Sequence, residues 1–287
     1  MRTGDAVGIV GLGLIGGSLA KAFRRRYPKR ALIAVEPNAK IRRMARRDGF
    51  VEVLSPRPTS ALSRCSLVVL CVPIDDVLHL MGPVSALMRD GAILTDVAGV
   101  KEPVLEAALS GVRPGVAFVG THPMLGGESG GYAASRGELW KGGTVAVCTD
   151  GPSKRAVSEV VRLHRTLGAR VVLCTAAEHD AAAAAISHLP YLLASALALT
   201  AQGAGALAHR LSARGLADAT RLAAFPYEVQ GEAARRNTHL VYAVRSFGGN
   251  LRSLLDALAG SPTSARIAFG RARAAKASLG AASARRG

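Results

Sequence analysis

The sequence predicts an α/β protein in which a doubly wound parallel sheet is followed by an all-helical part. Three observations predict this class. Short apolar runs alternate with helix-like stretches up to residue 174, as in successive strand–helix–strand units. Most of these runs lack polar alternation, which is typical of strands covered on both faces. Residues 176–259 are rich in Ala and Leu and poor in β-branched runs, which indicates helices.

The elements are expected in alternation along the first 174 residues. The predicted strands are Ala6–Val10, Ala31–Val35, Leu67–Val72, Ala92–Val97, Val116–Gly120, Thr144–Cys148 and Arg170–Cys174. The segments with helical spacing between them are 16–26, 39–48, 76–89, 101–110 and 153–167. In the helical part, breaks are expected near Gly203–Gly205, Phe225–Pro226 and Phe247–Gly249, and a frayed tail is expected from residue 261.

The composition and charge of the chain limit which partners it is expected to bind. The chain has 287 residues, of which 49% are apolar, so it is long enough for about two domains and too apolar for disorder. Its four cysteines lack metal-ligand spacing, so we expect no metal and a reducing compartment, the cytoplasm. The formal charge is +17, and six basic residues lie in the acid-free tail 261–287. Such a tail either holds nucleic acid or stays solvated; without interleaved aromatic residues, nucleic acid is not the expected partner.

Residues 181–201 carry no formal charge and are long enough to cross a bilayer. His188 and Pro190 interrupt this run, and alanine makes up much of its length. A helix that is apolar on every side is equally suited to a buried protein interface. We therefore expect no membrane partner.

A glycine motif follows the first predicted strand. Gly11, Gly13 and Gly16 form a GxGxxG pattern that leads into a helix, which is the context a dinucleotide site requires. Gly11 permits the tight turn, Gly13 lets the backbone approach a pyrophosphate, and Gly16 allows close packing of helix on strand. Leu14 and Ile15 lie within the same turn. An ordinary strand–helix turn is the alternative, but the context favours a Rossmann-type domain.

Glu36 ends the second predicted strand, 20 residues beyond Gly16, where an acid accepts hydrogen bonds from the ribose hydroxyls of NAD. A carboxylate there repels the 2′-phosphate of NADP, although three basic residues follow it, namely Lys40, Arg42 and Arg43. NAD is therefore the expected cofactor, with NADP second. Val72, Pro73 and Asp96 lie at the ends of two further strands and are expected to line the cofactor crevice.

His122 stands on a glycine-rich loop that follows the strand ending near Gly120. A histidine at the carboxyl end of a strand, beside a dinucleotide site, is well placed for proton transfer. A loop histidine that caps a turn is the alternative for this residue.

At these residues the chain resembles the prephenate and arogenate dehydrogenases of tyrosine biosynthesis. The resemblance is carried by GLGLIGGSLA (11–20), CVP (71–73), TDVAGVK (95–101), THPMLGGESGG (121–131), EHD (178–180), ISHLPY (186–191) and ATRLA (219–223). It covers residues 6–260 and implies a dinucleotide-binding domain over 1–174 and a helical domain over 175–260 that pairs two subunits. Residues 261–287 are the basic tail.

The resemblance implies NAD(P)-dependent oxidative decarboxylation of prephenate or arogenate, to 4-hydroxyphenylpyruvate or tyrosine. His122 would accept the proton of the substrate hydroxyl, and Arg221 would pair with a substrate carboxylate. Arg221 taken alone is a surface arginine. Glu128 would gate access or pair with a base, or be a solvated loop acid. His179 and Asp180 would form a hydrogen-bonded structural pair at the interdomain hinge, among the substrate-binding residues. His188 would face the substrate or be a hydrogen-bonded core residue.

The sequence departs from the family pattern on the substrate side. Gly99 stands where the family has a serine that links the catalytic histidine to substrate and cofactor, and Tyr191 replaces a second histidine. A tryptophan common in the family is also missing near Phe225. A dehydrogenase of a modified prephenate, such as 4-amino-4-deoxyprephenate, or a weakly active or non-catalytic NAD-binding homologue therefore stays open. A hydroxyacid dehydrogenase shares the glycine motif but leaves the His122 and His188 motifs unexplained.

Overall fold

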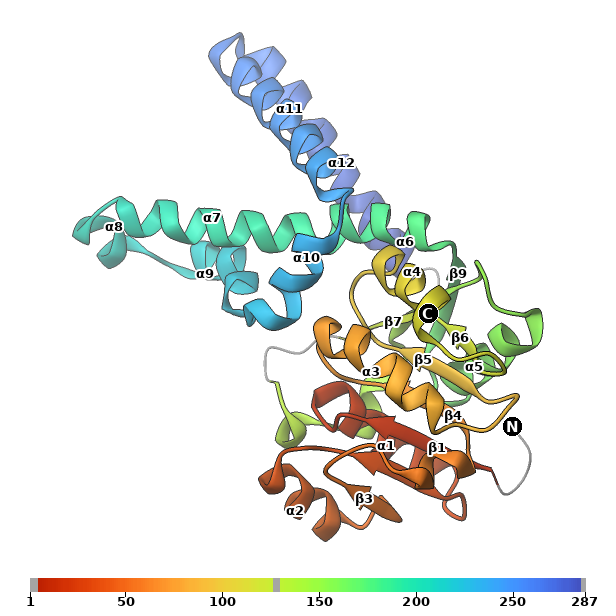
Figure 1. Ribbon diagram of the computed structural model, residues 1–287. Coiled ribbons are helices and arrows are strands. Elements are labelled where there is room, and N and C mark those ends of the chain that lie inside the picture. Colours follow the sequence, from red (N-terminus) through yellow and green to blue (C-terminus); the bar gives the residue numbers. More distant parts are fainter. Residues whose placement is uncertain (1–4, 126–129, 285–287) are drawn as a thin grey trace. The chain divides into compact units, whose positions relative to one another are not determined.

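The computed structural model describes residues 5–125 and 130–284. The chain forms two compact units, residues 1–238 and residues 239–287. The predicted class is confirmed, because a parallel sheet with helices precedes a helical part (Figure 1). The domain boundary at 174/175 stays a prediction.

The first unit contains a six-stranded parallel sheet in the order β3-β2-β1-β4-β5-β6. Its strands are β1 (Ala6–Val10), β2 (Leu32–Val35), β3 (Val53–Ser55), β4 (Cys65–Leu70), β5 (Ile93–Asp96) and β6 (Ala117–Val119). The strand order reverses at β1, so a crevice opens between β1 and β4 at the carboxyl end of the sheet. The predicted glycine motif lies at this point.

Helices cover both faces of the sheet. One face packs against α1 (Leu14–Arg26), α2 (Ala39–Asp48) and α5 (Lys154–Thr166), and the other against α3 (Ile74–Ala86) and α4 (Glu102–Gly111). Alternate residues of β1 divide between the two cores: Val7 and Ile9 face the first, and Val10 faces the second. Burying a large aliphatic side chain stabilises the fold by about 1.5–3 kcal/mol, so both faces hold the strand ends in place.

A second sheet corrects the prediction of one parallel sheet. It contains β7 (Thr121–Met124), β8 (Thr144–Cys148) and β9 (Arg170–Cys174), with β7 antiparallel to β8. Only Gly120 separates β6 from β7, and a parallel neighbour needs a crossover of a dozen or more residues. Strand β7 therefore joins a different sheet, and it occupies an edge, which suits Pro123 because proline has no N–H.

Helices make up the rest of the chain. In the first unit these are α6 (Ala176–Ala183), α7 (Leu189–Gly203), α8 (Ala206–Leu211), α9 (Arg214–Thr220) and α10 (Glu232–Arg236), with shorter helical turns at η1 (Ser60–Arg64), η2 (Tyr132–Ala134), η3 (Gly137–Trp140), η4 (Ala184–His188), η5 (Arg221–Ala224) and η6 (Tyr227–Gly231). The expected breaks at Gly203–Gly205 and Phe225–Pro226 are found.

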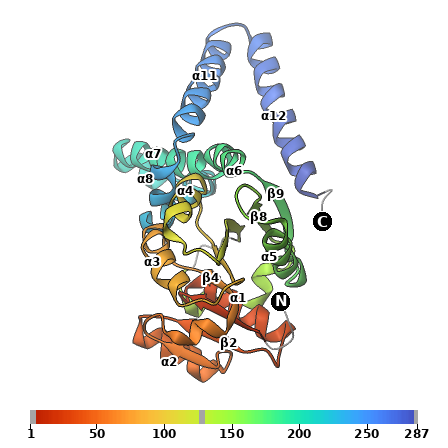
Figure 2. The same ribbon diagram turned by 45° about the vertical axis from the view of Figure 1, so that its right-hand side comes forward.

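The second unit is a helical hairpin of α11 (Leu240–Ala259) and α12 (Pro262–Ala284) (Figure 2). The break predicted at Phe247–Gly249 is wrong, because α11 runs through these residues without interruption. Two glycines cost a helix about 2 kcal/mol together, which is too little to interrupt this 20-residue helix. Residues 262–284 are helical and not the frayed tail that was expected.

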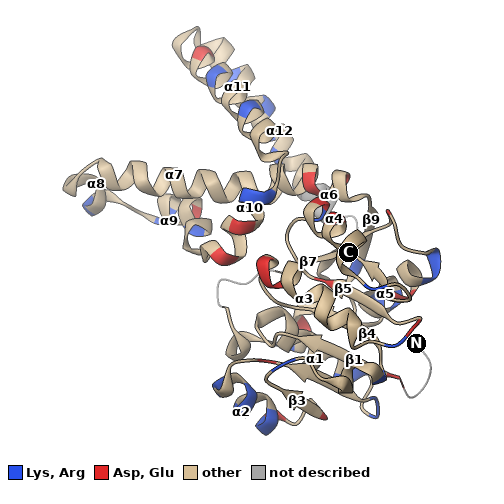
Figure 3. Ribbon diagram, in the orientation of Figure 1, with Lys and Arg blue, Asp and Glu red and all other residues tan. Residues whose placement is uncertain are grey.

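One long helix, α7, contains no Lys, Arg, Asp or Glu. Helix α7 is tan along its length in Figure 3, in agreement with its sequence. The segment Ala176–Gly203, which includes α7, has the length and apolar composition of a membrane span, and 22% of its most apolar 18-residue window is buried within the protein. The same features suit a helix that packs against another protein chain.

A buried histidine makes the stability of the first unit depend on pH. His164 on α5 is 1% exposed, packs on Trp140 with ring centroids 5.2 Å apart, and finds no hydrogen-bond partner for either ring nitrogen in the described part of the chain. Burial lowers the pKa of His164 to about 4. Because the unfolded chain takes up the proton first, near pH 6.5, stability is full above that pH and declines towards pH 4, by about 3 kcal/mol from this residue.

We expect His164→Phe to remove this part of the pH dependence. Urea unfolding, followed by the fluorescence of Trp140, measures the free energy of unfolding at pH 7 and pH 4.5. The difference between the two pH values is expected to be smaller in His164→Phe than in the unchanged protein. His209→Phe, at an exposed histidine, serves as the control. An equal pH dependence in all three proteins would contradict the assignment.

Candidate active site at the carboxyl edge of the sheet

The glycine turn has the geometry that a dinucleotide requires. Gly11 has φ +90°, and a Cβ there would lie 2.5 Å from the carbonyl oxygen of Cys71. A Cβ on Gly16 would lie 2.0 Å from the carbonyl oxygen of Gly11, so both positions need glycine. Gly13 precedes α1, and a Cβ there would meet no atom within 4 Å. Open space over Gly13, at the N-terminus of α1, fits a pyrophosphate that binds free backbone N–H groups.

Glu36 is bound into this turn. It is buried, and its Oε2 accepts a hydrogen bond from the Leu12 amide at 2.8 Å, while Oε1 accepts from the Asn38 amide at 2.8 Å. The Arg42 guanidinium donates to the carbonyl oxygens of Glu36 and Pro37 at 2.8 and 2.6 Å. The carboxylate and a cation thus stand together where the second strand ends. This arrangement places the two groups that discriminate between NAD and NADP at one position.

The other predicted cofactor residues divide into two groups. Leu14 and Ile15 are half-buried in the first turn of α1, and Val72 and Pro73 precede α3 at the neighbouring strand end. Their predicted contact with the cofactor stays a prediction. Asp96 differs, because its side chain is fully buried in an ion pair. Its carboxylate does not face the crevice, which corrects the expectation from the sequence.

Asp96 and Lys101 form the ion pair, and it holds the start of β7. The Lys101 ammonium pairs with Asp96 and donates to the carbonyl oxygen of Thr121 at 2.8 Å; the side chains of both charged residues are fully buried. Asp96 Oδ1 also accepts from the Thr121 amide at 3.0 Å, and the Thr121 hydroxyl donates to the Asp96 carbonyl oxygen. All three polar groups of Thr121 are thereby fixed, and His122 is the next residue.

His122 lies at the end of a chain of three hydrogen-bonded side chains. Its Nδ1 is 2.9 Å from Nε2 of His179, and His179 Nδ1 is 2.6 Å from Oδ1 of Asp180. The Asp180 carboxylate also accepts from the backbone amides of Lys101 and Glu102 at 2.7 and 2.8 Å, at the N-terminus of α4. The chain is therefore anchored at its acidic end, and it connects α6 with β7.

This arrangement determines which nitrogen of His122 is free. A carboxylate only accepts, so His179 Nδ1 donates to Asp180, and the Nε2 of a neutral His179 accepts. His122 Nδ1 then donates to His179, and His122 Nε2 carries the lone pair. Among the described residues the structure gives that Nε2 no hydrogen-bond partner. Burial, helped by the neighbouring His179, Lys101 and His188, holds the pKa of His122 well below its usual range, so the ring is a neutral proton acceptor.

His188 occupies the wall beside this chain. It is buried, and Asn237 Nδ2 lies 3.0 Å from its Nδ1. Asn237 Nδ2 also donates to the Asp180 carbonyl oxygen at 2.8 Å. Burial lowers the pKa of His188, and the Gly99 backbone and Asp180 oppose this effect. The predicted contact of His188 with substrate stays a prediction.

Gly99 faces His122 across a small gap. A Cβ at Gly99 would lie 3.8 Å from Nε2 of His122 and 3.2 Å from Cβ of Ala233. A serine hydroxyl at this position would therefore come within hydrogen-bonding reach of Nε2. With glycine, no side chain at position 99 reaches that nitrogen.

For two of the three remaining predicted residues the structure gives an element and an exposure. Arg221 is exposed and begins η5, and Tyr191 is half-buried on α7, three residues beyond His188. Glu128 lies outside the described residues. Lys101 and Asn237 are the residues that sequence reasoning missed. A lysine within five residues of Asp96 was a possible signal, but Asn237 had none, because its partners lie 49 and 57 residues away.

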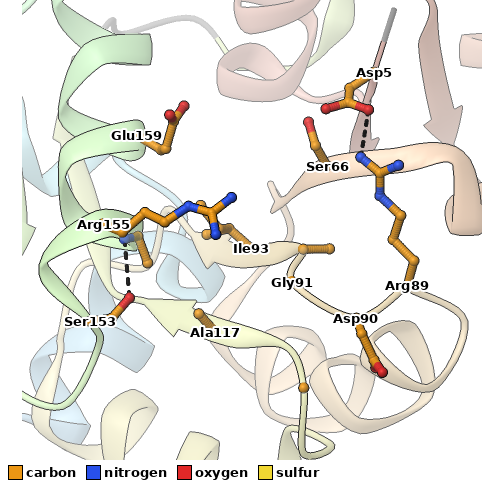
Figure 4. Close-up of a pocket in the computed structure, with 13 residues that line it drawn as sticks. Asp5, Ser66, Arg89, Asp90, Gly91, Ile93, Ala117, Ser153, Arg155 and Glu159 are labelled. Carbon is orange, nitrogen blue, oxygen red and sulfur yellow. Dashed lines mark hydrogen bonds and ion pairs between the residues drawn. The ribbon is translucent and has the colours of Figure 1, made fainter. Parts of the chain in front are cut away.

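A cavity of about 450 Å³ lies elsewhere, at the amino ends of the strands. Figure 4 shows Arg89 paired with Asp5 on one side and Arg155 on the other. Ligands of open parallel sheets bind outside the carboxyl ends of the strands. This cavity is therefore not the site built by the glycine turn and His122. No group of three His, Cys, Asp or Glu side chains suited to a metal ion occurs among the described residues.

Comparison with known proteins gives matches along most of the chain. Residues 19–173 match the family model for the nucleotide-binding domain of prephenate dehydrogenase, and residues 175–259 match the model for its dimerization domain. The chain is 27% identical over 225 residues to the prephenate dehydrogenase of Bacillus subtilis, an alignment that covers 76% of this chain and 60% of that protein. The chain thus spans about 60% of the length of the first curated relatives it matches.

Two further similarities concern a curated relative and a solved structure. The chain is 34% identical over 137 residues to the 4-amino-4-deoxyprephenate dehydrogenase of Streptomyces pristinaespiralis, covering 48% of this chain and 43% of that protein. Its fold matches the prephenate dehydrogenase of Aquifex aeolicus, solved in complex with hydroxyphenyl propionate and NAD+, with a TM-score of 0.87 at 23% identity over 97% of this chain and 98% of that one. The two family models together cover the chain from residue 19 to residue 259, with a gap at residue 174. This chain belongs to the prephenate dehydrogenase family.

Proposed function

We propose that the chain catalyses the NAD-dependent oxidative decarboxylation of prephenate or a close analogue such as arogenate. One observation carries this proposal: the Asp180–His179–His122 chain leaves an unprotonated Nε2 at the carboxyl edge of the sheet. A base at that edge can draw off the proton of a substrate hydroxyl. NAD, when bound, would accept the hydride from the ring carbon that carries this hydroxyl.

Residues of the chain are assigned to proton transfer, to substrate binding and to cofactor binding. His122 Nε2 takes the hydroxyl proton, and His179 and Asp180 stabilise the positive charge that His122 then carries. The substrate loses its ring carboxylate as carbon dioxide while the ring becomes aromatic. Arg221 is the proposed partner of a substrate carboxylate. Gly13 and the N-terminus of α1 would hold the pyrophosphate, and Glu36 the ribose.

Turnover of defined substrates tests the proposal. Purified protein is incubated with NAD and, separately, with prephenate, arogenate and 4-amino-4-deoxyprephenate. Growth of NADH absorbance, matched by release of carbon dioxide, is expected with at least one of them. Binding of NAD without turnover of any of the three would identify a non-catalytic NAD-binding protein instead.

Gly99 favours a second candidate, oxidation of 4-amino-4-deoxyprephenate. Gly99 replaces the serine that the family carries. A substrate hydroxyl at His122 Nε2 therefore lacks a second hydrogen-bond partner at position 99. An amino group can donate a hydrogen bond to the free Nε2 of His122 without a second protein hydroxyl. The relative from Streptomyces pristinaespiralis supports this candidate. A higher kcat/KM with the amino substrate than with prephenate would favour it.

We expect Glu36→Gln to weaken discrimination against NADP. The change keeps the shape of the side chain but removes the negative charge that repels a 2′-phosphate, while Arg42 remains beside it. The ratio of KM for NADP to KM for NAD is expected to fall by about tenfold or more, equivalent to about 1.4 kcal/mol. Glu52→Gln, at a surface ion pair with Arg64, is the control. An unchanged ratio would show that Glu36 does not contact the ribose.

We infer that the active form is a homodimer paired through the helical domain. Helix α7 has no charged residue, yet its Leu192, Leu197 and Leu199 are exposed, the last at 68%. The match of residues 175–259 to a dimerization domain supports a second copy as the partner that covers these side chains. The cytoplasmic location expected from the cysteines stays a prediction.

Sedimentation measures the association. The unchanged protein is expected at twice its chain mass of 29.6 kDa, and the double variant Leu192→Glu, Leu199→Glu is expected to shift towards the monomer. Leu109→Glu, at an exposed leucine of α4, should leave the mass unchanged. A monomer in the unchanged protein at all concentrations would contradict the inference.

A further inference from the structure

Two cysteines stand opposite each other at the ends of neighbouring strands. Cys148 ends β8 and Cys174 ends β9, and they are direct partners in the register of these parallel strands. The Thr149 amide donates to the Cys174 carbonyl oxygen at 3.0 Å, so the pairing continues to the last residue. Adjacent strands lie about 4.7–4.9 Å apart, and a disulfide bond requires Cα atoms about 4.4–6.8 Å apart. The backbone separation is therefore suitable for a disulfide.

The two thiols are not equivalent. Cys148 is fully buried, whereas Cys174 is partly exposed. The neighbouring Cys148 lowers the pKa of Cys174 against the opposing effects of burial, Glu178, Asp150 and Asp180. The neighbouring Cys174 and burial raise the pKa of Cys148. The accessible sulfur is thus the more nucleophilic one, and its partner stands directly opposite on the adjacent strand.

We propose that Cys148 and Cys174 form an oxidation site at which a peroxide converts the two thiols to an intramolecular disulfide. The Cys174 thiolate attacks one peroxide oxygen, the O–O bond breaks, and a sulfenic acid forms while hydroxide leaves. The Cys148 sulfur then attacks the Cys174 sulfur, the S–O bond breaks, and the Cys148 proton leaves with the departing oxygen as water. Two electrons pass from the thiols to the peroxide, which is reduced to two waters.

The site adjoins the helix that carries the proposed relay. Thr175 follows Cys174 and caps α6, and the Asp150 carboxylate accepts from the Ala176 amide at 2.9 Å. His179 lies one turn further along α6. A bond between Cys148 and Cys174 constrains the point at which α6 begins, so we infer that oxidation changes the position of His179. This last step rests on the proposed function, whereas formation of the disulfide does not.

Mass spectrometry tests the disulfide without any activity assay. Reduced protein is treated with hydrogen peroxide, quenched with catalase, denatured and alkylated with N-ethylmaleimide. The number of alkylated thiols is expected to fall from four to two, and digestion is expected to release one linked pair of peptides containing residues 148 and 174. Four alkylated thiols after treatment, or a link between two protein molecules, would overturn the proposal.

Single variants separate the two roles. Cys148→Ser is expected to accumulate a sulfenic acid on Cys174 that dimedone traps, and Cys174→Ser is expected to give no dimedone adduct on Cys148. Cys65→Ser is the matched control, because Cys65 is buried on β4, burial raises its pKa to about 12, and its loss should leave the disulfide intact. A dimedone adduct on Cys148 in the Cys174→Ser variant would overturn the assigned order.

The effect on α6 has its own readout. With whichever substrate turns over, kcat of the oxidised protein is expected to fall several-fold and to return on addition of dithiothreitol, while Cys174→Ser keeps its kcat after peroxide treatment. A disulfide that forms and leaves kcat unchanged would overturn the link to His179 but not the oxidation site. If no substrate turns over, the thiol count still decides whether the site exists.

Discussion

Replacing His122 by Asn is expected to lower kcat by about 100-fold or more, because general-base catalysis contributes about 10²–10⁴-fold and an amide cannot take up the proton. The substitution is conservative for the structure. The Asn amide can donate to His179 as His122 Nδ1 does now, so the relay stays bound. Steady-state growth of NADH measures kcat, and fluorescence titration measures the affinity for NAD, which is expected to stay nearly unchanged.

The pH profile gives this prediction a second, independent readout. A base works only when neutral, so activity is lost as pH falls through its pKa. Because burial holds the pKa of His122 well below its usual range, kcat/KM is expected to stay level from pH 8 to about pH 6.5 and to fall only at lower pH. A decline centred near pH 6.5, or a His122→Asn variant with unchanged kcat, would remove His122 from the mechanism.

Arg221→Ala provides the contrast. A residue that only pairs with a substrate carboxylate binds ground state and transition state alike, so its loss raises KM and leaves kcat largely intact. His122→Asn is expected to do the opposite. If both variants lowered kcat equally and left KM unchanged, the division of roles between base and carboxylate partner would be wrong.

The elements that could be predicted are those with an uninterrupted apolar run in the sequence, whether buried, as β1, or partly exposed, as β9. The bounds of β1, β8 and β9 were predicted to the residue, because each is an uninterrupted run with apolar residues on both faces. Strand β3 was missed because it has only three half-buried residues. Strand β7 was missed because Pro123 and the surrounding glycines indicate a loop. Its pairing with β8 depends on residues 20 to 26 positions away.

In the candidate site, too, local motifs could be predicted and long-range partners could not. His122 and the glycine turn stand in short local motifs, so their chemistry was visible in the sequence. The partners of His122 were not, because the hydrogen bond to His179 spans 57 residues and depends on how α6 packs near β7. Asp96 shows the converse error: its place at a strand end suggested a cofactor contact, but Lys101, five residues on, turns it into an internal ion pair.

Replacing Lys101 by Met is expected to destabilise the protein by about 3–5 kcal/mol, the usual loss when one partner of a buried ion pair is removed. Met keeps most of the volume, so packing is not the cause. Asp96 would keep hydrogen bonds from the Ala98 and Thr121 amides, but its charge would have no cation inside the protein. Urea unfolding, followed by fluorescence, measures the loss.

Two companion variants identify the cause as the unpaired charge. Asp96→Asn combined with Lys101→Met removes both charges and is expected to recover much of the loss, because replacing a buried pair by neutral groups is often nearly neutral. Arg64→Met breaks an exposed pair with Glu52 and is expected to cost less than about 1 kcal/mol. If Lys101→Met cost no more than Arg64→Met, the pair would contribute nothing. Because the pair fixes all three polar groups of Thr121, the position of His122 would then depend on the Asp180–His179 chain alone.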